Sequence, residues 1–150
     1  MRAVIQRVTQ ASVHIDAKLH SEIKNGLVVL LGIENDDTQE DVLWLTNKIA
    51  KMRIFSDENG LMNKSVQDID GAILVVSQFT LFASTKKGNR PGFIRSAKPE
   101  ISIPLYENFI KKIQILIQKP IQTGVFGAEM QVSLLNNGPV TITVDTKNKE

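Results

Sequence analysis

The sequence predicts an α+β protein in which a curled, barrel-like and mostly antiparallel β-sheet is covered by two α-helices. Three observations predict this class. Strand-like segments outnumber helical ones, the two helical segments stand between runs of strands, and the 150-residue chain has no internal repeat or linker-like segment. A hydrophobic content of 42% with 23% charged residues is typical of a soluble globular protein. We therefore expect one domain over residues 1–150, with a frayed tail at 146–150.

The composition excludes several classes of protein. The chain has no cysteine, which excludes disulfide frameworks, thiol nucleophiles and cysteine-based zinc sites, and its two histidines argue against a structural zinc site. The longest apolar runs, 27–31 and 72–76, are far shorter than the roughly 18–20 residues of a membrane span. Arg7 interrupts the apolar N-terminus, so no signal peptide is expected. We expect a cytoplasmic protein with no metal, no cofactor and no membrane association.

The N-terminal quarter reads as strands. Residues 2–16 are rich in valine and isoleucine and have the two-residue period of a strand, with a break near Thr9-Gln10, and residues 21–24 can add a short strand. Asn25-Gly26 is a strong turn signal. The apolar run at 27–33 is long enough for a strand that is buried on both faces.

A helix is predicted from about Thr38 to Arg53. Thr38 is a suitable N-cap, acids follow it in the first turn, and apolar residues recur every three or four positions. An irregular segment lies between the turn signals at 57–60 and 70–71.

The second half begins with a predicted central strand at 72–82 and a long loop at 83–99. A second helix is expected to open at Ser102-Ile103-Pro104 and to end at Pro120. Two further strands, 130–135 and 140–145, are then expected to form a hairpin around the turn residues 136–139.

Ser77, Gln78, Phe79 and Thr80 place two hydroxyls and an amide at the end of a very apolar strand, where a long loop begins. Strand ends that open into loops are common places for functional sites. The hydroxyls could be nucleophiles, or donors that hold a polar ligand. They could equally bond only to nearby backbone. A nucleophilic hydroxyl also needs a base, and neither histidine is evidently near.

Two other features stand out in the second half of the chain, residues 76–150, which holds 10 Lys/Arg and 5 Asp/Glu. Lys86, Lys87, Arg90 and Arg95 lie in a stretch, 84–99, that has no acidic residue and could attract phosphates or simply be solvated.

The second feature is the run from Asn136 to Thr141. Its plain interpretation is a hairpin turn in which Gly138 supplies unusual backbone angles. The bond before Pro139 could also be cis, although only about 5–6% of X–Pro bonds in folded proteins are.

Together these motifs resemble the D-aminoacyl-tRNA deacylase family, also called D-tyrosyl-tRNA deacylases. The resemblance runs from Met1 to about Asp145 and rests on Ser77–Thr80 and on Asn136-x-Gly138-Pro139-x-Thr141 in the expected order. The further matching segments are 2–8, 26–32, 53–55, 62–63, 88–93, 123–126 and 130–132.

The resemblance implies a homodimer with a small barrel-like fold that hydrolyses the ester of a D-amino acid on tRNA. Glycine mischarged on alanine tRNA is also an expected substrate. Gly138 and Pro139 are then the cis pair that enters the partner's pocket and leaves no room for an L side chain. Arg7 is expected to brace that pair. Asn136, Thr141 and Met130 complete the implied substrate-binding set.

The chemical step has two possible descriptions. In one, Thr80 is a nucleophile. In the other, which we favour, main-chain groups around Phe79 and Thr80 hold the substrate while the ribose 2′-hydroxyl of the terminal adenosine assists attack by water. Competing functions are a Thr- or Ser-dependent hydrolase of another ester and a non-catalytic tRNA-binding module that uses the basic loop.

Overall fold

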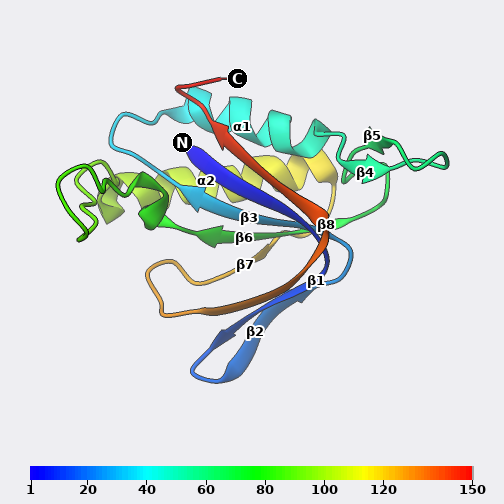
Figure 1. Ribbon diagram of the computed structural model, residues 1–150, viewed down its shortest axis with the longest axis horizontal. Helices are drawn as coiled ribbons and strands as arrows, with labels where there is room; N and C mark the ends of the chain where they lie inside the picture. The colour runs from blue at the N-terminus through cyan, green and yellow to red at the C-terminus, as the bar shows by residue number, and fades with distance from the viewer. Residues whose placement is uncertain (150) are drawn as a thin grey trace.

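The computed structural model describes residues 1–149 (Figure 1). It contains two α-helices, one 3₁₀ helix and eight strands within that part of the chain. In chain order they are β1 (Arg2–Ile15), β2 (Lys18–Ile23), β3 (Gly26–Gly32), α1 (Gln39–Lys51), β4 (Phe55–Ser56), β5 (Met62–Lys64), β6 (Ala72–Ser77), η1 (Phe79–Phe82), α2 (Pro99–Ile117), β7 (Gln122–Thr123) and β8 (Gln131–Asp145).

The main sheet has six strands in the order β2-β1-β3-β6-β7, and β8 pairs with the other side of β1. The pairs that involve β1 are antiparallel, whereas β3–β6 and β6–β7 are parallel. In Figure 1 the sheet curls and both long helices lie on one side of it. The predicted fold class is confirmed: one domain with a curled, mostly antiparallel sheet and two helices.

Both faces of the central strands are buried. Ile5 and Val29 pack with helix residues such as Phe109, whereas Val28 and Leu74 pack with a second cluster on the opposite face. Burying both faces of a strand requires a nearly continuous apolar run, as β3 and β6 have. The prediction of a doubly buried strand at 27–33 is therefore confirmed.

The N-terminus of α1 was predicted correctly. The hydroxyl of Thr38 accepts a hydrogen bond from the Glu40 amide, and the Asp41 carboxylate accepts one from the Thr38 amide. This reciprocal pattern satisfies amides that the first helical turn leaves without partners. The second helix begins earlier than predicted, at Pro99, which occupies a first-turn position, so that Pro104 lies inside the helix.

Two strand predictions were wrong in an instructive way. β1 is continuous through Thr9-Gln10 because the irregularity there is a shift of register against β8. The predicted hairpin at 136–139 is not a hairpin. Both halves of β8 pair antiparallel with β1, and residues 137–140 form a bulge between the pairs Asn136–Val8 and Thr141–Gln6.

The C-terminal tail also differs from its prediction. Thr146 is buried, its hydroxyl accepts a hydrogen bond from the Met1 ammonium, and Lys147 forms an ion pair with Asp41. These contacts hold Thr146 and Lys147 against the N-terminus and α1, and Glu150 lies outside the described residues. Among residues 1–149, no helix is both long enough and apolar enough to span a membrane.

Candidate active site

The main candidate site is a cavity of about 510 Å³ beside the end of β6. Its lining is apolar and aromatic with a few hydroxyl and amide groups, as small-molecule sites commonly are. Among the described residues, Lys98 is its only charged lining residue, and no histidine or carboxylate lines it. The lining consists of Leu31, Ile33, Val76, Ser77, Gln78, Phe79, Phe93, Ser96, Ala97, Lys98, Pro99, Ser102, Phe126, Gly127, Ala128, Met130 and Val132.

The predicted catalytic residues surround one side of this cavity. Ser77 is the last residue of β6, and the chain then turns into η1 rather than continuing as the predicted strand to Phe82. The Gln78 amide N–H donates to the Leu31 carbonyl at 2.8 Å, which fixes the start of the turn on β3. Phe79 and Thr80 are exposed, and the side-chain amide of Gln78 donates a hydrogen bond to the Thr80 hydroxyl.

The loop after η1 folds back over the same turn. The rings of Phe93 and Phe79 meet edge to face with centroids 5.0 Å apart. The Ser96 hydroxyl donates to the Phe79 carbonyl at 2.8 Å. The loop therefore forms a wall of the cavity and also contacts the main chain of the predicted catalytic segment.

The second motif lies in the bulge of β8. The Gly138–Pro139 peptide bond is cis, and both residues are exposed. Arg7 lies opposite the bulge; its Nε donates to the Asn137 carbonyl at 2.9 Å and its Nη1 donates to the Ile54 carbonyl. This arrangement places Arg7 where a brace of the bulge was predicted.

Asn136 and Thr141 flank this bulge and form hydrogen bonds across it. The Asn136 side-chain oxygen accepts from the Val140 amide at 3.2 Å, and its Nδ2 donates to the Thr141 hydroxyl at 3.3 Å. Gln6 also donates to the Thr141 hydroxyl, at 3.4 Å. Side chains on both strands thus satisfy polar groups that the bulge removes from the ladder.

A single chain does not bring the two motifs together. Ser77 pairs with Leu31 on β3, whereas Arg7, opposite the bulge, pairs with Leu27. Four residues along a strand span about 13 Å. In Figure 1, β6 runs to the left of the sheet and β8 bends at the right.

Met130 does join the cavity. It lies next to Gly124, where an added Cβ would be 2.3 Å from the Met130 sulfur, so the glycine makes the space that the methionine occupies. Sequence analysis matched Gly124 only as part of a family segment. Its contact with Met130 comes from pairing β7 beside β6, which is a tertiary feature.

The predicted phosphate contacts separate into two groups. Lys86, Lys87 and Arg90 are exposed, and no ion pair involves them among the described residues. Arg95 instead bonds Glu34 through Nη2 at 2.7 Å and Nε at 3.1 Å, and this contact raises the pKa of the guanidinium. Arg95, whose side chain is 55% exposed, therefore has a partner within the protein, the buried Glu34, and its role toward a phosphate stays a prediction.

Comparisons with known proteins decide the family. The model of the family described as D-Tyr-tRNA(Tyr) deacylase matches residues 4–145. The chain belongs to this family. It is 63% identical over 150 residues to a D-aminoacyl-tRNA deacylase of Flavobacterium johnsoniae and 61% identical to one of Bacteroides fragilis, in each case over the whole of both chains.

Solved structures agree with this membership. A structure titled c-Myc DNA Unwinding Element Binding Protein matches with a TM-score of 0.92 and 42% identity, over 97% of this chain and 98% of that one. A probable eukaryotic D-amino acid tRNA deacylase matches with a TM-score of 0.81 over 95% and 97% of the two chains, and at 17% identity it supports the fold alone. The resemblance to deacylases and the predicted class, a hydrolase of aminoacyl-tRNA esters, are confirmed at the level of the family.

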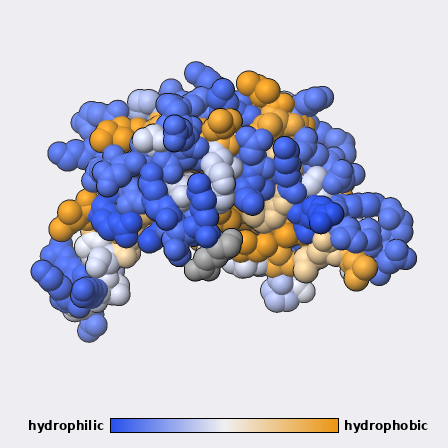
Figure 2. Space-filling model, turned by 90° about the horizontal axis from the view of Figure 1, so that it is seen from above, coloured by the Kyte–Doolittle hydropathy of each residue, from blue (hydrophilic) through white to orange (hydrophobic). Residues whose placement is uncertain are grey.

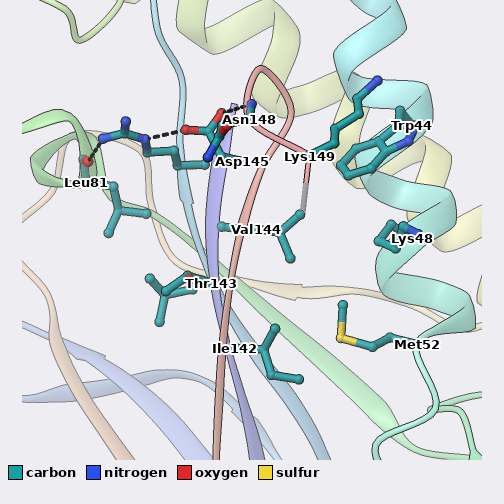
Figure 3. Close-up of a pocket in the computed structure, with 13 residues that line it drawn as sticks. Trp44, Lys48, Met52, Leu81, Ile142, Thr143, Val144, Asp145, Asn148 and Lys149 are labelled. Atoms are coloured by element: carbon teal, nitrogen blue, oxygen red, sulfur yellow. Dashed lines mark hydrogen bonds and ion pairs between the residues drawn. The ribbon is translucent and has the colours of Figure 1, made fainter.

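A second cavity, of about 450 Å³, lies between α1 and β8 (Figure 3). Arg2 and Asp145 form an ion pair at its edge at 2.8 Å. The ammonium groups of Lys48 and Lys149 lie 5.5 Å and 4.7 Å from the Trp44 ring. None of the predicted site residues lines this cavity. In Figure 2, the side of the molecule that is uppermost in Figure 1 is mostly hydrophilic, with separate hydrophobic patches.

Proposed function

We propose that the protein hydrolyses the ester bond of D-aminoacyl-tRNA in the cytoplasm and releases tRNA and the free D-amino acid. The observation that carries this proposal is the cavity beside β6. It presents the polar groups of Ser77 and Gln78 and the exposed segment Phe79–Thr80 next to an apolar volume of about 510 Å³. An aminoacyl adenosine has both a flat aromatic base and a polar ester to place there.

We favour catalysis by main-chain groups and the substrate's own 2′-hydroxyl. No histidine or carboxylate among the described residues lines the cavity, so the commonest general bases are missing from its wall. Water attacks the ester carbonyl carbon, the bond to the 3′ oxygen breaks, and that oxygen takes up a proton. Main-chain N–H groups around Phe79 and Thr80 are suited to stabilise the negative charge that develops on the carbonyl oxygen.

The alternative, in which Thr80 is the nucleophile, is less well supported. The partner of its hydroxyl is the Gln78 amide N–H, which donates a hydrogen bond to the hydroxyl oxygen. An amide in that orientation cannot withdraw the hydroxyl proton, as the base beside a nucleophile must.

We propose that chirality is checked by a second copy of the chain. Gly138 and Pro139 are exposed at one end of the sheet, and the cavity lies at the other. A homodimer can place the main-chain carbonyls of one bulge at the cavity of its partner. A wall of backbone has no rotamer that could move aside, so it excludes L side chains rather than selecting D side chains. Glycine has no side chain to exclude, so glycine on alanine tRNA is a further proposed substrate.

Lys86, Lys87 and Arg90 are the proposed phosphate contacts. They lie on the loop that also supplies Phe93 and Ser96 to the cavity wall. Phosphate contacts of this kind position a nucleic acid without reading its sequence.

The test is deacylation of D-tyrosyl-tRNA and L-tyrosyl-tRNA by the purified protein. We expect hydrolysis of the D ester only. The Thr80→Ala variant should keep activity within about fivefold of the unmodified protein, and a tRNA whose terminal adenosine lacks the 2′-hydroxyl should resist hydrolysis.

Three results would count against parts of this proposal. A folded, tRNA-binding but inactive Thr80→Ala variant favours the nucleophile mechanism. Salt-sensitive tRNA binding without any deacylation favours a non-catalytic binding module. Equal hydrolysis of simple esters favours a general esterase.

A further inference from the structure

Ser96 bonds the one segment that the proposed mechanism relies on for main-chain contacts. Its hydroxyl donates to the Phe79 carbonyl at 2.8 Å, and both residues line the cavity. Neither the motifs in the sequence nor the family match assigns a function to this serine.

The hydrogen bond to the Phe79 carbonyl also affects the Thr80 N–H, because both groups belong to one peptide unit. The Phe79 carbonyl and the Thr80 N–H belong to the same planar peptide group, in which they point in opposite directions when the bond is trans. Gly138–Pro139 is the only cis bond among the described residues, so the Phe79–Thr80 bond is trans. A hydrogen bond that fixes the direction of the Phe79 carbonyl therefore also fixes the direction of the Thr80 N–H.

Ser96 itself is held from a rigid part of the sheet. It forms an antiparallel bridge with Glu34, and the Ala97 amide donates to the Ile33 carbonyl at 2.9 Å, directly beyond the end of β3. The neighbouring Arg95 donates both of its hydrogen bonds to Oε2 of the buried Glu34, and Oε1 of that carboxylate has no hydrogen-bond partner among the described residues. Losing Arg95 would leave a buried charge unpaired, so this attachment resists displacement.

The part of the turn that Ser96 holds, Phe79–Thr80, is its exposed part. Phe79 is 56% exposed and Thr80 is exposed, whereas only Phe82 of η1 is buried. Phe93 of the same loop lies against Phe79, whereas the other end of η1 is held from β1 by Arg2, which donates to the Leu81 carbonyl at 3.0 Å and lies 4.7 Å from the Phe82 ring centroid. Without such contacts, an exposed turn of four residues is free to tilt its peptide groups.

We infer that Ser96 is a positioning residue, which aims the Thr80 N–H at the substrate carbonyl by holding the other side of the same peptide group. This inference rests on the proposed deacylase function. It predicts an effect on the chemical step more than on substrate binding, because a misaimed donor loses most where negative charge develops.

The experiment compares Ser96→Ala with Ser96→Thr, which keeps the hydroxyl, and with Ser84→Ala as a matched control. Ser84 is an exposed serine of the same loop whose main chain pairs with Gly92. For D-tyrosyl-tRNA we expect Ser96→Ala to lower kcat by about three- to tenfold, with KM changed less than about twofold. Ser96→Thr should recover most of the loss, and Ser84→Ala should match the unmodified protein.

A second measurement does not depend on activity. In ¹H–¹⁵N NMR spectra, the Thr80 amide signal should shift in Ser96→Ala but not in Ser84→Ala. An unchanged kcat, or an unshifted Thr80 amide, overturns the inference. If Ser96→Ala does not fold, Ser96→Cys, with a weaker donor of similar size, decides the question by the same two readouts.

The two proposals fail in different ways. If the unmodified protein does not hydrolyse D-tyrosyl-tRNA, the proposed function fails, and the Thr80 amide signal still decides whether Ser96 orients that peptide. If the unmodified protein is active and Ser96→Ala is equally active, only the inference about Ser96 fails.

Discussion

The segment Ser77–Thr80 and the bulge around Gly138-Pro139 both present backbone to solvent, but they are held by different means. The first is a strand end whose turn is held by side chains of a loop, chiefly Phe93 and Ser96. The second is an insertion in a continuous strand, held by Arg7 from the neighbouring strand. The Ser77–Thr80 segment should therefore tolerate changes to its own side chains, whereas the bulge around Gly138-Pro139 should not tolerate an added Cβ.

The largest effect is expected from Gly138→Ala. The φ of Gly138 is +154°, and an added Cβ would lie 2.5 Å from the Val140 nitrogen. The bulge must therefore change shape. Backbone strain of about 1–3 kcal/mol, released by displacing the bulge, should lower D-tyrosyl-tRNA hydrolysis by more than tenfold and weaken the discrimination against L-tyrosyl-tRNA.

Gly60→Ala is the control for that variant. Gly60 also has a positive φ, +79°, but an added Cβ there would meet no atom within 4 Å. It should cost some stability and leave activity and discrimination unchanged, with folding checked by circular dichroism. Unchanged D-specific activity in Gly138→Ala would show that the bulge does not form the chiral wall.

Arg7→Lys should have the next largest effect. Arg7 donates to two carbonyls, of Asn137 and Ile54, and a lysine ammonium cannot reproduce that fork. Hydrogen bonds from charged groups contribute about 1.5–3 kcal/mol each, so we expect roughly a tenfold loss in kcat/KM and a reduced Tm. Wild-type kinetics in this variant would mean that Asn136 and the strand pairing hold the bulge without the arginine.

Gly124→Ala tests the cavity beside the Ser77–Thr80 segment. The added Cβ would lie 2.3 Å from the Met130 sulfur, which is too close for two atoms that are not bonded. The flexible methionine side chain would therefore have to move. If it moves into the cavity, KM should rise about threefold or more for D-tyrosyl-tRNA and less for glycyl-tRNA. Steady-state kinetics on both substrates check this, and an equal rise for the two would contradict it.

Lys147→Ala should affect neither motif. Lys147 bonds Asp41 at 2.8 Å beside the N-terminus of α1. Burial alone would raise the pKa of Asp41, but hydrogen bonds from Lys147, Thr146 and Thr38 outweigh it and lower that pKa. Deacylation should stay at the wild-type rate, and the loss of stability should be below about 1 kcal/mol because the lysine is partly exposed.

The effect of Lys147→Ala on stability should depend on pH, because the pKa of Asp41 is lowered in the folded protein. A carboxyl with a lowered pKa in the folded state stabilises the fold at pH values above its unfolded pKa of about 4, and this contribution is lost as the pH falls through the folded pKa. The difference in Tm between Lys147→Ala and the unmodified protein should therefore be present at pH 7 and shrink below about pH 4. A difference that persists in acid would assign it to packing rather than to the ion pair.

Local patterns were sufficient for much of this fold. The capping residues before α1, the doubly apolar runs of β3 and β6 and the strand periodicity of β1 each depend on neighbours close in sequence. The same holds for the Ser77–Thr80 segment and for Asn136–Thr141, whose residues and order carry the resemblance to the deacylase family.

Long-range pairing decided the rest. Gly138-Pro139 lies in a bulge rather than a hairpin because β1 is long enough to pair with both halves of β8, and no pattern within residues 130–145 contains that length. Thr146 is ordered because the Met1 ammonium lies beside it. Arg95 was expected to face phosphates and faces Glu34, and Ser96 reaches the Phe79 carbonyl only because its loop extends β3. The sequence by itself determined which residues are candidates for this chemistry, through local propensity and side-chain type. The tertiary structure alone decided what those residues contact, because contacts between distant segments form only when the whole sheet and its loops pack together.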